Sequence, residues 1–336
     1  MKPERIVVFR ALKFGDLLCA IPALRALRHA HPSAHITLVG LPWALRFARR
    51  YPHYIDRFVT FPGAPGLPES VPDMHAYERM LEHLRAQAFD LAVQMHGDGR
   101  LTNSIVMAFG ARRTVGYHPV DAKAPKHDDF WPYPMQGHEI VRNLDLVKRL
   151  GAPVDDARLE FPLIAADARE LMSYPRLAAL APKTYVCLHP GASTADKRWP
   201  PERFAAIGDA LADRGYRVVI TGSGAERPIA QAVAHAMHAP TVDAACDVSI
   251  GGLAHVITHA RLIVSNDTGV AHLASALRVP SVVVFFSTDV DRWAPLDAQL
   301  HRTVANRYGV PVSDVLAQVD ALLLNKPLAV NETSLV

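Results

Sequence analysis

Asp267, Thr268 and Gly269 are well suited to binding an anion because of the residues on either side of them. They follow the apolar run Leu262–Val264 and precede an alanine-rich stretch that favours a helix. Such a helix would be capped by the Asp-Thr pair and would offer free backbone N–H groups, with glycine allowing a close approach. His272 comes one helical turn after Thr268 and so falls on the same side. A plain capped helix with a surface histidine has the same pattern, so this segment alone allows either interpretation.

Residues 190–200 have the composition of a phosphate-binding loop. They follow the apolar run Tyr185–Leu188 and present the hydroxyls of Ser193 and Thr194 and then the cation of Lys197. A phosphate group needs backbone donors at close range, hydroxyl donors and a compensating positive charge. The spacing differs from that of the P-loop, which excludes a P-loop nucleoside triphosphatase.

Gly222–Glu226 form a third candidate loop, after the apolar run Arg217–Thr221. The carboxylate of Glu226 has the chemistry to hold the hydroxyls of a ribose. Because ordinary turns also use glycine, this loop is a weaker signal than the other two.

In the first half of the chain, Asp16 is the candidate for acid–base chemistry. It ends the loop that leaves the strand-like run Ile6–Phe9, and a helix is predicted from about Leu17. Loops at this edge of a parallel sheet line the binding crevice, so we expect the Asp16 carboxylate to point into it, with Lys13 in the same loop. An aspartate that only caps a helix would occupy the same position.

His96 and Arg100 follow another predicted strand, Phe89–Met95. At the end of a strand on the binding side they would contact an acceptor molecule, although a purely structural loop explains them equally well. The stretch Pro119–Gly137 shows no periodicity, and we predict that it is a loop of the kind that forms an acceptor-binding or lid segment.

These segments require an α/β scaffold. Apolar β-branched runs alternate with helix-like stretches, which predicts two α/β halves with parallel sheets whose carboxyl edges carry the loops. Prolines between residues 158 and 182 indicate the boundary. We therefore predict a first domain at residues 1–165, which carries Asp16, a second domain at residues 166–325, whose loops suit a nucleotide, and a tail at residues 326–336.

Composition excludes several other classes. The 336 residues carry a formal net charge of +3, which does not favour a nucleic-acid partner. No apolar run is long enough to cross a bilayer, and the N-terminus lacks the features of a signal peptide, so we expect a cytoplasmic protein. The three cysteines have no metal-binding spacing, and no metal centre is expected. Arg46, Arg49 and Arg50 could support peripheral contact with the cytoplasmic face of an anionic inner membrane.

Three motifs together resemble glycosyltransferase family 9, which includes the ADP-heptose:lipopolysaccharide heptosyltransferases. They are FRALKFGDLLCAIPALRALR at Phe9–Arg28, HPGAS with KRWP between His189 and Pro200, and NDTGVAHLA at Asn266–Ala274. The resemblance implies a GT-B architecture, in which an acceptor-side Rossmann-like domain, residues 1–165, and a nucleotide-sugar-binding Rossmann-like domain, residues 166–325, face each other across a central cleft. It also implies an inverting, metal-independent transfer of a heptose from a nucleotide-diphosphate sugar, ADP-heptose, to a lipid-linked saccharide such as a lipopolysaccharide core. The nucleotide sugar is then a substrate, and no cofactor is required.

The resemblance also implies roles for individual residues. Asp16 corresponds to the general base, and Lys13, His96 and Arg100 lie on the acceptor side. The residues that correspond to donor contacts are Ser193, Thr194, Lys197, Glu226, Asp267, Thr268, Gly269 and His272. Where the best-known heptosyltransferases have a Thr-Thr pair, this chain has Ala192-Ser193, which leaves another nucleotide sugar as an alternative donor. An epimerase or hydrolase of nucleotide sugars and a non-catalytic binding protein of the same fold are the further alternatives.

Overall fold

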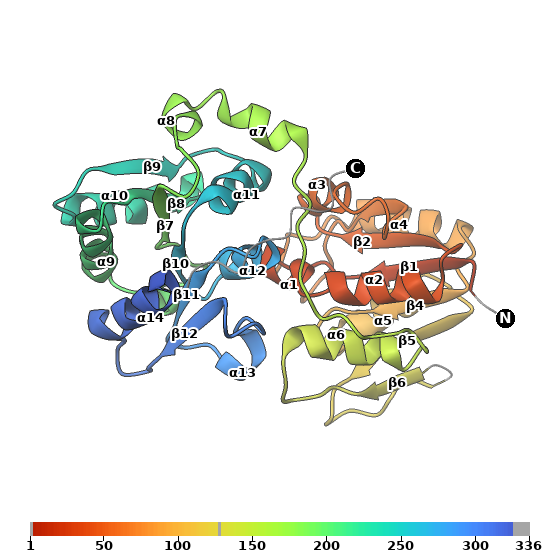
Figure 1. The fold of residues 1–336 in the computed structure, drawn as a ribbon. Coiled ribbons are helices and arrows are strands. Elements are labelled where there is room, and N and C mark those ends of the chain that lie inside the picture. The colour runs from red at the N-terminus through yellow and green to blue at the C-terminus, as the bar shows by residue number, and fades with distance from the viewer. Residues whose placement is uncertain (1–2, 127–128, 325–336) are drawn as a thin grey trace. The chain divides into compact units, whose positions relative to one another are not determined.

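The structure is a computed structural model that describes residues 3–126 and 129–324. The chain forms two compact units, Met1–Pro162 (unit 1) and Leu163–Val336 (unit 2), coloured red to yellow-green and green to blue in Figure 1. Each unit contains one six-stranded parallel sheet. The predicted tail, residues 326–336, lies outside the described residues.

Unit 1 is built on a sheet with the strand order β3-β2-β1-β4-β5-β6. Its strands are β1 (Arg5–Phe9), β2 (His35–Gly40), β3 (Arg57–Thr60), β4 (Leu91–Gln94), β5 (Arg113–His118) and β6 (Asp129–Pro132). Its helices are α1 (Phe14–Leu18), α2 (Ile21–Ala30), α3 (Ala44–Ala48), α4 (Met74–Ala86), α5 (Thr102–Met107) and α6 (Glu139–Lys148). The central strand β1 pairs in parallel with β2 and β4, and its residues Ile6 to Phe9 are fully buried. Burial of consecutive residues is typical of a parallel strand covered on both faces.

Unit 2 has a sheet with the order β12-β11-β10-β7-β8-β9. Its strands are β7 (Tyr185–His189), β8 (Arg217–Gly222), β9 (Thr241–Ala245), β10 (Ile263–Asn266), β11 (Ser281–Phe285) and β12 (His301–Ala305). Its α-helices are α7 (Ala165–Leu171), α8 (Pro175–Ala178), α9 (Pro201–Asp213), α10 (Arg227–Ala236), α11 (Ile250–His259), α12 (Gly269–Ala276), α13 (Val290–Trp293) and α14 (Val312–Leu324). Short 3-10 turns lie at Ala195–Lys197 and Gly224–Glu226. The core packs β7, β8, β10 and β11 against α9, α10 and α14 (Figure 1).

Both sheets follow the same winding. In each unit the first strand is central, the next two extend to one side and the last three to the other. The direction of winding therefore reverses between β1 and β4 in unit 1 and between β7 and β10 in unit 2. In open α/β sheets, ligands bind at the carboxyl ends of the strands at this reversal. The loops that carry the predicted site residues follow these strands, and only the loop of Glu226 follows a different one, β8.

Two local predictions are wrong. The helix expected from about Leu17 is divided, because the chain turns at Cys19 and Ala20 between α1 and α2. Pro22 lies in the first turn of α2, where a missing N–H is tolerated, so it begins a new helix. The stretch Pro119–Gly137 is not wholly a loop, since it contains the edge strand β6. A strand of four residues is too short to produce a recognisable alternation.

No helix within residues 3–126 and 129–324 combines the length and the apolar character that a bilayer crossing requires.

Candidate functional site

The loop after β7 presents the predicted phosphate-binding groups. Ser193 and Thr194 are exposed, and Lys197 is half-buried in the 3-10 turn that follows. The Arg198 guanidinium donates to the carbonyl of Ala192 at 2.9 and 3.1 Å, which folds the loop back on itself. The Lys197 ammonium lies 3.7 Å from the Asp267 carboxylate, so the structure brings together predicted donor residues from two loops.

The loop after β10 leads into α12 as the sequence predicts. Thr268 is its N-cap residue, and its hydroxyl accepts a hydrogen bond from the Val270 N–H at 3.2 Å. Asp267 is only 6% exposed; burial raises the pKa of its carboxyl, and the nearby Lys197 opposes that rise. His272 is 4% exposed, with its ring centroid 6.0 Å from that of Trp293, so the alternative of a surface histidine is wrong.

Asn266 connects the loops after β7 and β10, a role that was not predicted from sequence. Its side-chain amide donates to the carbonyl of Pro190 at 2.8 Å, and its Oδ1 accepts from the Trp199 N–H at 2.9 Å. The amide therefore contacts both ends of the loop after β7, which begins at Pro190 and closes at the buried Trp199. A buried asparagine at the end of a strand is a detectable signal, since a polar side chain there must find partners.

Glu226 lies in the loop after β8 and contacts the loop after β7. Its Oε2 accepts from both the N–H and the hydroxyl of Ser223 at 2.8 Å. A Cβ atom added to Gly191 would stand 2.2 Å from Glu226 Oε1, so the carboxylate packs directly against this glycine. Burial works to raise the pKa of Glu226, but the neighbouring His189 and the hydrogen bonds from Ser223 hold it below its ordinary value. The carboxylate is therefore ionised at neutral pH.

These three loops lie at the same edge of one sheet. The strands that they follow are adjacent, in the order β10-β7-β8, and all are parallel. Exposed hydroxyls, the Lys197 ammonium, a helix N-terminus and an ionised carboxylate are therefore gathered in one region of unit 2. That set of groups can bind a diphosphate and a sugar hydroxyl.

In unit 1, Asp16 lies in the first turn of α1 and is partly exposed. Asp16 is not the N-cap residue of this helix, which is the exposed Lys13, and the Lys13 side chain makes no capping hydrogen bond. The backbone carbonyl of Asp16 accepts a hydrogen bond from Nε of the buried Arg10 at 2.8 Å. This hydrogen bond fixes the main chain at Asp16.

His96 and Arg100, at the end of the neighbouring strand β4, differ strongly in exposure. His96 is 5% exposed: its Nδ1 accepts from the Ala11 N–H at 3.3 Å and its Nε2 lies 3.6 Å from Glu69 Oε1. Burial, with a contribution from the Arg10 charge, lowers the pKa of His96 to about 3, so its ring is neutral at pH 7. Arg100 is exposed and pairs with Asp121. Of the two, Arg100 is the one whose side chain reaches solvent.

Arg50 is buried, so the prediction that it joins Arg46 and Arg49 in contact with a membrane is wrong. It is 8% exposed, its guanidinium lies 4.6 Å from the ring centroid of Phe161, and it donates to the Pro162 carbonyl at 3.0 Å. Arg46 and Arg49, by contrast, are exposed on α3. An aromatic residue far along the chain could not be identified as the partner of Arg50 from sequence.

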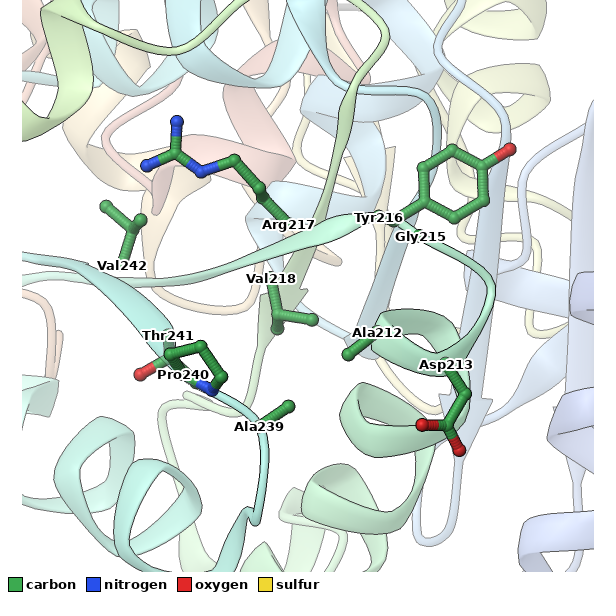
Figure 2. Close-up of a pocket in the computed structure, with 10 residues that line it drawn as sticks. All are labelled: Ala212, Asp213, Gly215, Tyr216, Arg217, Val218, Ala239, Pro240, Thr241 and Val242. Atoms are coloured by element: carbon green, nitrogen blue, oxygen red, sulfur yellow. The ribbon is translucent and has the colours of Figure 1, made fainter.

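A cavity of 490 Å³ in unit 2 lies at the opposite edge of the sheet, where β8 and β9 begin. Figure 2 shows Ala212, Val218 and Ala239 near its centre, with Tyr216 and Arg217 extending in different directions. None of the predicted site residues lines it. Within the described part of the chain, no three His, Cys, Asp or Glu residues are grouped closely enough to hold a metal ion.

Comparison with known sequences supports one family. Residues 77–314, more than half of the chain, match the model of glycosyltransferase family 9 (heptosyltransferase). A lipopolysaccharide heptosyltransferase 3 of Escherichia coli is 25% identical over 96% of this chain and 99% of its own. Lipopolysaccharide heptosyltransferase 1 of Pseudomonas aeruginosa is 25% identical over 85% of this chain and 79% of its own.

Solved structures share the fold. A glycosyltransferase of family 9 from Veillonella parvula has a TM-score of 0.83 at 20% identity, covering 96% of this chain and 97% of its own. The E. coli ADP-heptose heptosyltransferase II has a TM-score of 0.74 at 19% identity, covering 95% and 98%. E. coli heptosyltransferase WaaC with ADP has a TM-score of 0.72 at 19% identity, covering 95% and 99%. These similarities confirm the predicted α/β fold of the GT-B class, and with the family match they establish that the chain belongs to glycosyltransferase family 9.

Proposed function

We propose that the protein is an inverting, metal-independent heptosyltransferase that moves a heptose from ADP-heptose to a lipopolysaccharide core or a related saccharide. The relatives carry the names of lipopolysaccharide and lipooligosaccharide heptosyltransferases. Solved structures of the same fold contain ADP or ADP-2-deoxy-2-fluoro heptose. The observation in this chain that carries the proposal is the grouping of three loops at the β10-β7-β8 edge of unit 2.

Unit 2 supplies the groups for the donor in this proposal. Ser193, Thr194 and Lys197 bind the diphosphate, together with the backbone donors around Thr268 and Gly269 at the start of α12. The ionised Glu226 accepts hydrogen bonds from the hydroxyls of the nucleoside ribose. Asp267 and His272, which are buried beside these groups, complete the donor contacts. Preorganised donors aimed at a leaving diphosphate stabilise the negative charge that develops on it.

Unit 1 supplies the groups for the acceptor. The acceptor hydroxyl oxygen forms a bond to the anomeric carbon of the heptose, while the bond from that carbon to the β-phosphate oxygen breaks. The hydroxyl proton passes to the Asp16 carboxylate, and ADP departs with the bonding electrons. Attack from the side opposite the leaving group inverts the anomeric configuration. The exposed cations Lys13 and Arg100 attract an anionic acceptor, and Arg46 and Arg49 support peripheral contact with the anionic cytoplasmic face of the inner membrane.

The first experiment is a thermal-shift titration with ADP, UDP and GDP in the presence of EDTA. ADP should raise the melting temperature most, since a ligand that binds only the native state stabilises it. Incubation with ADP-heptose and a heptose-deficient lipopolysaccharide core should then give a product heavier by one heptose, with NMR showing the inverted anomeric configuration.

The other outcomes separate the alternatives. A preference for UDP or GDP would keep the glycosyltransferase and discard heptose as the sugar. Consumption of ADP-heptose without any acceptor would indicate a hydrolase or epimerase. Binding of ADP with no turnover would indicate a non-catalytic nucleotide-sugar-binding protein.

A further inference from the structure

Arg10 is a buried cation directly after β1. Its side chain is 1% exposed and is one of the largest of the fully buried side chains in the described part of the protein. Taking a guanidinium out of water is costly unless every N–H group finds an acceptor. The acceptors that surround Arg10 therefore show what this residue holds in place.

These acceptors come from three separate segments of unit 1. The Nε group donates to the backbone carbonyl of Asp16 at 2.8 Å. One terminal nitrogen donates to the Met95 carbonyl at the end of β4 and to Asn143 Oδ1 of α6 at 3.1 Å. The other contacts Glu139 Oε1 of α6 at 3.1 Å. A single planar guanidinium thus connects α1, the loop after β4 and α6.

The helix that carries Asp16 depends on such an external contact. α1 has only 5 residues, and the N–H groups of Leu17 and Cys19 bond to the carbonyls of Lys13 and Gly15. A helix this short is unstable by itself in water, because few hydrogen bonds offset the cost of ordering its backbone. The hydrogen bond from Arg10 attaches the middle of α1 to the body of unit 1.

Arg142 provides a natural comparison within the same cluster. It contacts the other oxygen of Glu139 and is 4% exposed, so its burial and charge partner resemble those of Arg10. Its remaining hydrogen bonds go to the carbonyls of Pro134 and Gly137, at 3.1 and 3.2 Å. The two arginines therefore share a carboxylate but hold different segments.

We propose that Arg10 is a positioning residue for Asp16: its guanidinium fixes the backbone of α1, so that the Asp16 carboxylate is held where it receives the acceptor proton. This inference rests on the proposed function, in which Asp16 is the general base. The guanidinium acts through the main chain of α1.

The test compares Arg10→Lys with the matched variant Arg142→Lys, using ADP-heptose and a lipopolysaccharide core acceptor. Lysine keeps the charge but lacks the planar fork, so it cannot hold the Asp16 carbonyl and Glu139 together. Arg10→Lys should lower kcat about 10-fold to 100-fold, the size of effect that a small misplacement of a catalytic group produces, with the KM for the donor changed less than about twofold. Arg142→Lys should lose similar thermal stability and keep kcat within about threefold of the wild type.

Hydrogen–deuterium exchange of the same variants gives a readout that does not require turnover. The amides of Leu17 and Cys19 should exchange faster in Arg10→Lys, because local opening of α1 becomes easier, and at the wild-type rate in Arg142→Lys. If the wild type transfers no heptose, the proposed function fails, while the exchange comparison still decides whether Arg10 holds α1. Wild-type exchange in α1 of Arg10→Lys, or an equal loss of kcat in both variants, would overturn the inference.

A milder variant covers the case in which Arg10→Lys does not fold. Asn143→Ser removes the hydrogen bond that Arg10 donates to Oδ1 and the one that the amide donates to the Cys19 carbonyl, while the guanidinium stays in place. Asn143→Ser should lower kcat and speed the exchange of the α1 amides, as Arg10→Lys does, but by a smaller factor. An unchanged kcat together with unchanged exchange in Asn143→Ser would count against the inference.

Discussion

Asp16 is partly exposed in the first turn of α1, where its backbone is anchored by Arg10. We expect Asp16→Asn to lower kcat by about 100-fold or more, since a positioned general base contributes at least that much, and to leave ADP binding unchanged. Turnover with saturating donor and calorimetric titration with ADP measure the two effects separately.

Asp320→Asn is the matched control, because Asp320 is a partly exposed aspartate on the surface of α14 that pairs with Arg214. It should retain the turnover of the wild type. Near-normal turnover in Asp16→Asn would show that another group accepts the proton.

Lys197 is a cation of the loop after β7 and lies 3.7 Å from the buried Asp267 carboxylate. Lys197→Met removes the charge that would face the diphosphate, and it also leaves Asp267 without the cation that opposes the rise of its pKa. We expect the affinity for ADP to fall about 10-fold or more, as for the loss of one charge-assisted hydrogen bond. Calorimetry measures it. Arg214→Met, which removes a cation from a surface pair with Asp320, should bind ADP normally, and equal affinity in all three proteins would exclude a phosphate role for Lys197.

The sequence identified chemically suited residues more readily than the residues that hold them. Hydroxyls, a cation and a helix cap stand close together in sequence, so Ser193, Lys197 and Thr268 could be selected from local pattern. Asn266 and Arg10 could not be assigned a role in this way. Their partners lie up to 133 residues away, and only the fold brings Arg10 to Asn143.

At the scale of elements, the loops after β7 and β8 pack against each other where the Glu226 carboxylate contacts Gly191. Gly191→Ala would place a Cβ atom 2.2 Å from Glu226 Oε1, so the carboxylate must move away from its hydrogen bonds to Ser223. We expect this variant to lose no more than about 1 kcal/mol of unfolding free energy, because the clashing atoms are the mobile end of a side chain and only its hydrogen bonds to Ser223 are disturbed. Urea unfolding measures the loss.

A double-mutant cycle isolates the contact between these two loops. In a Glu226→Ala background the added methyl group contacts no carboxylate. Gly191→Ala should therefore lower the free energy of unfolding by less in that background than in the wild type. Equal costs in the two backgrounds would show that the contact between Gly191 and Glu226 does not explain the glycine.

Elements buried in the sheets were easier to predict than those at their edges. Runs such as Val282–Val284 and Ile6–Phe9 are apolar throughout because both faces of these strands are covered. The edge strands β3, β6, β9 and β12 and the helices α13 and α14 were not predicted. β3 and β12 expose part of each face, so their sequences mix polar and apolar residues and resemble loops.

At the scale of the whole molecule, both units contain histidines that folding keeps neutral. Burial lowers the pKa of His96 in unit 1 to about 3 and that of His301 in unit 2 to about 4. In the unfolded chain each would have a pKa of about 6.5. Below that pH the unfolded state binds more protons than the native state. The stabilisation that comes from the neutral histidines is therefore fully present above pH 6.5 and is lost as the pH falls toward the native pKa values.

Each of these histidines should therefore lower the free energy of unfolding by about 1.4 kcal/mol for each pH unit below about pH 6. Urea unfolding between pH 7.5 and pH 5 measures the slope. His96→Asn should make it shallower, since asparagine can still accept from the Ala11 N–H but does not titrate. His75→Asn, an exposed position on α4, should leave it unchanged. A slope in His96→Asn equal to that of the wild type would contradict a neutral, buried His96.

The four outer strands of the two sheets also affect how copies of this protein behave in concentrated solution. An unpaired sheet edge is a template for aggregation, because its free N–H and C=O groups can recruit a strand from another molecule. β3 and β6 have only 4 residues each, β9 and β12 have 5, and each carries a charged side chain, at Arg57, Asp129, Asp243 and Arg302. β6 also ends at Pro132, which cannot donate a ladder hydrogen bond. Short, charged and proline-terminated edges of this kind oppose the growth of intermolecular sheets.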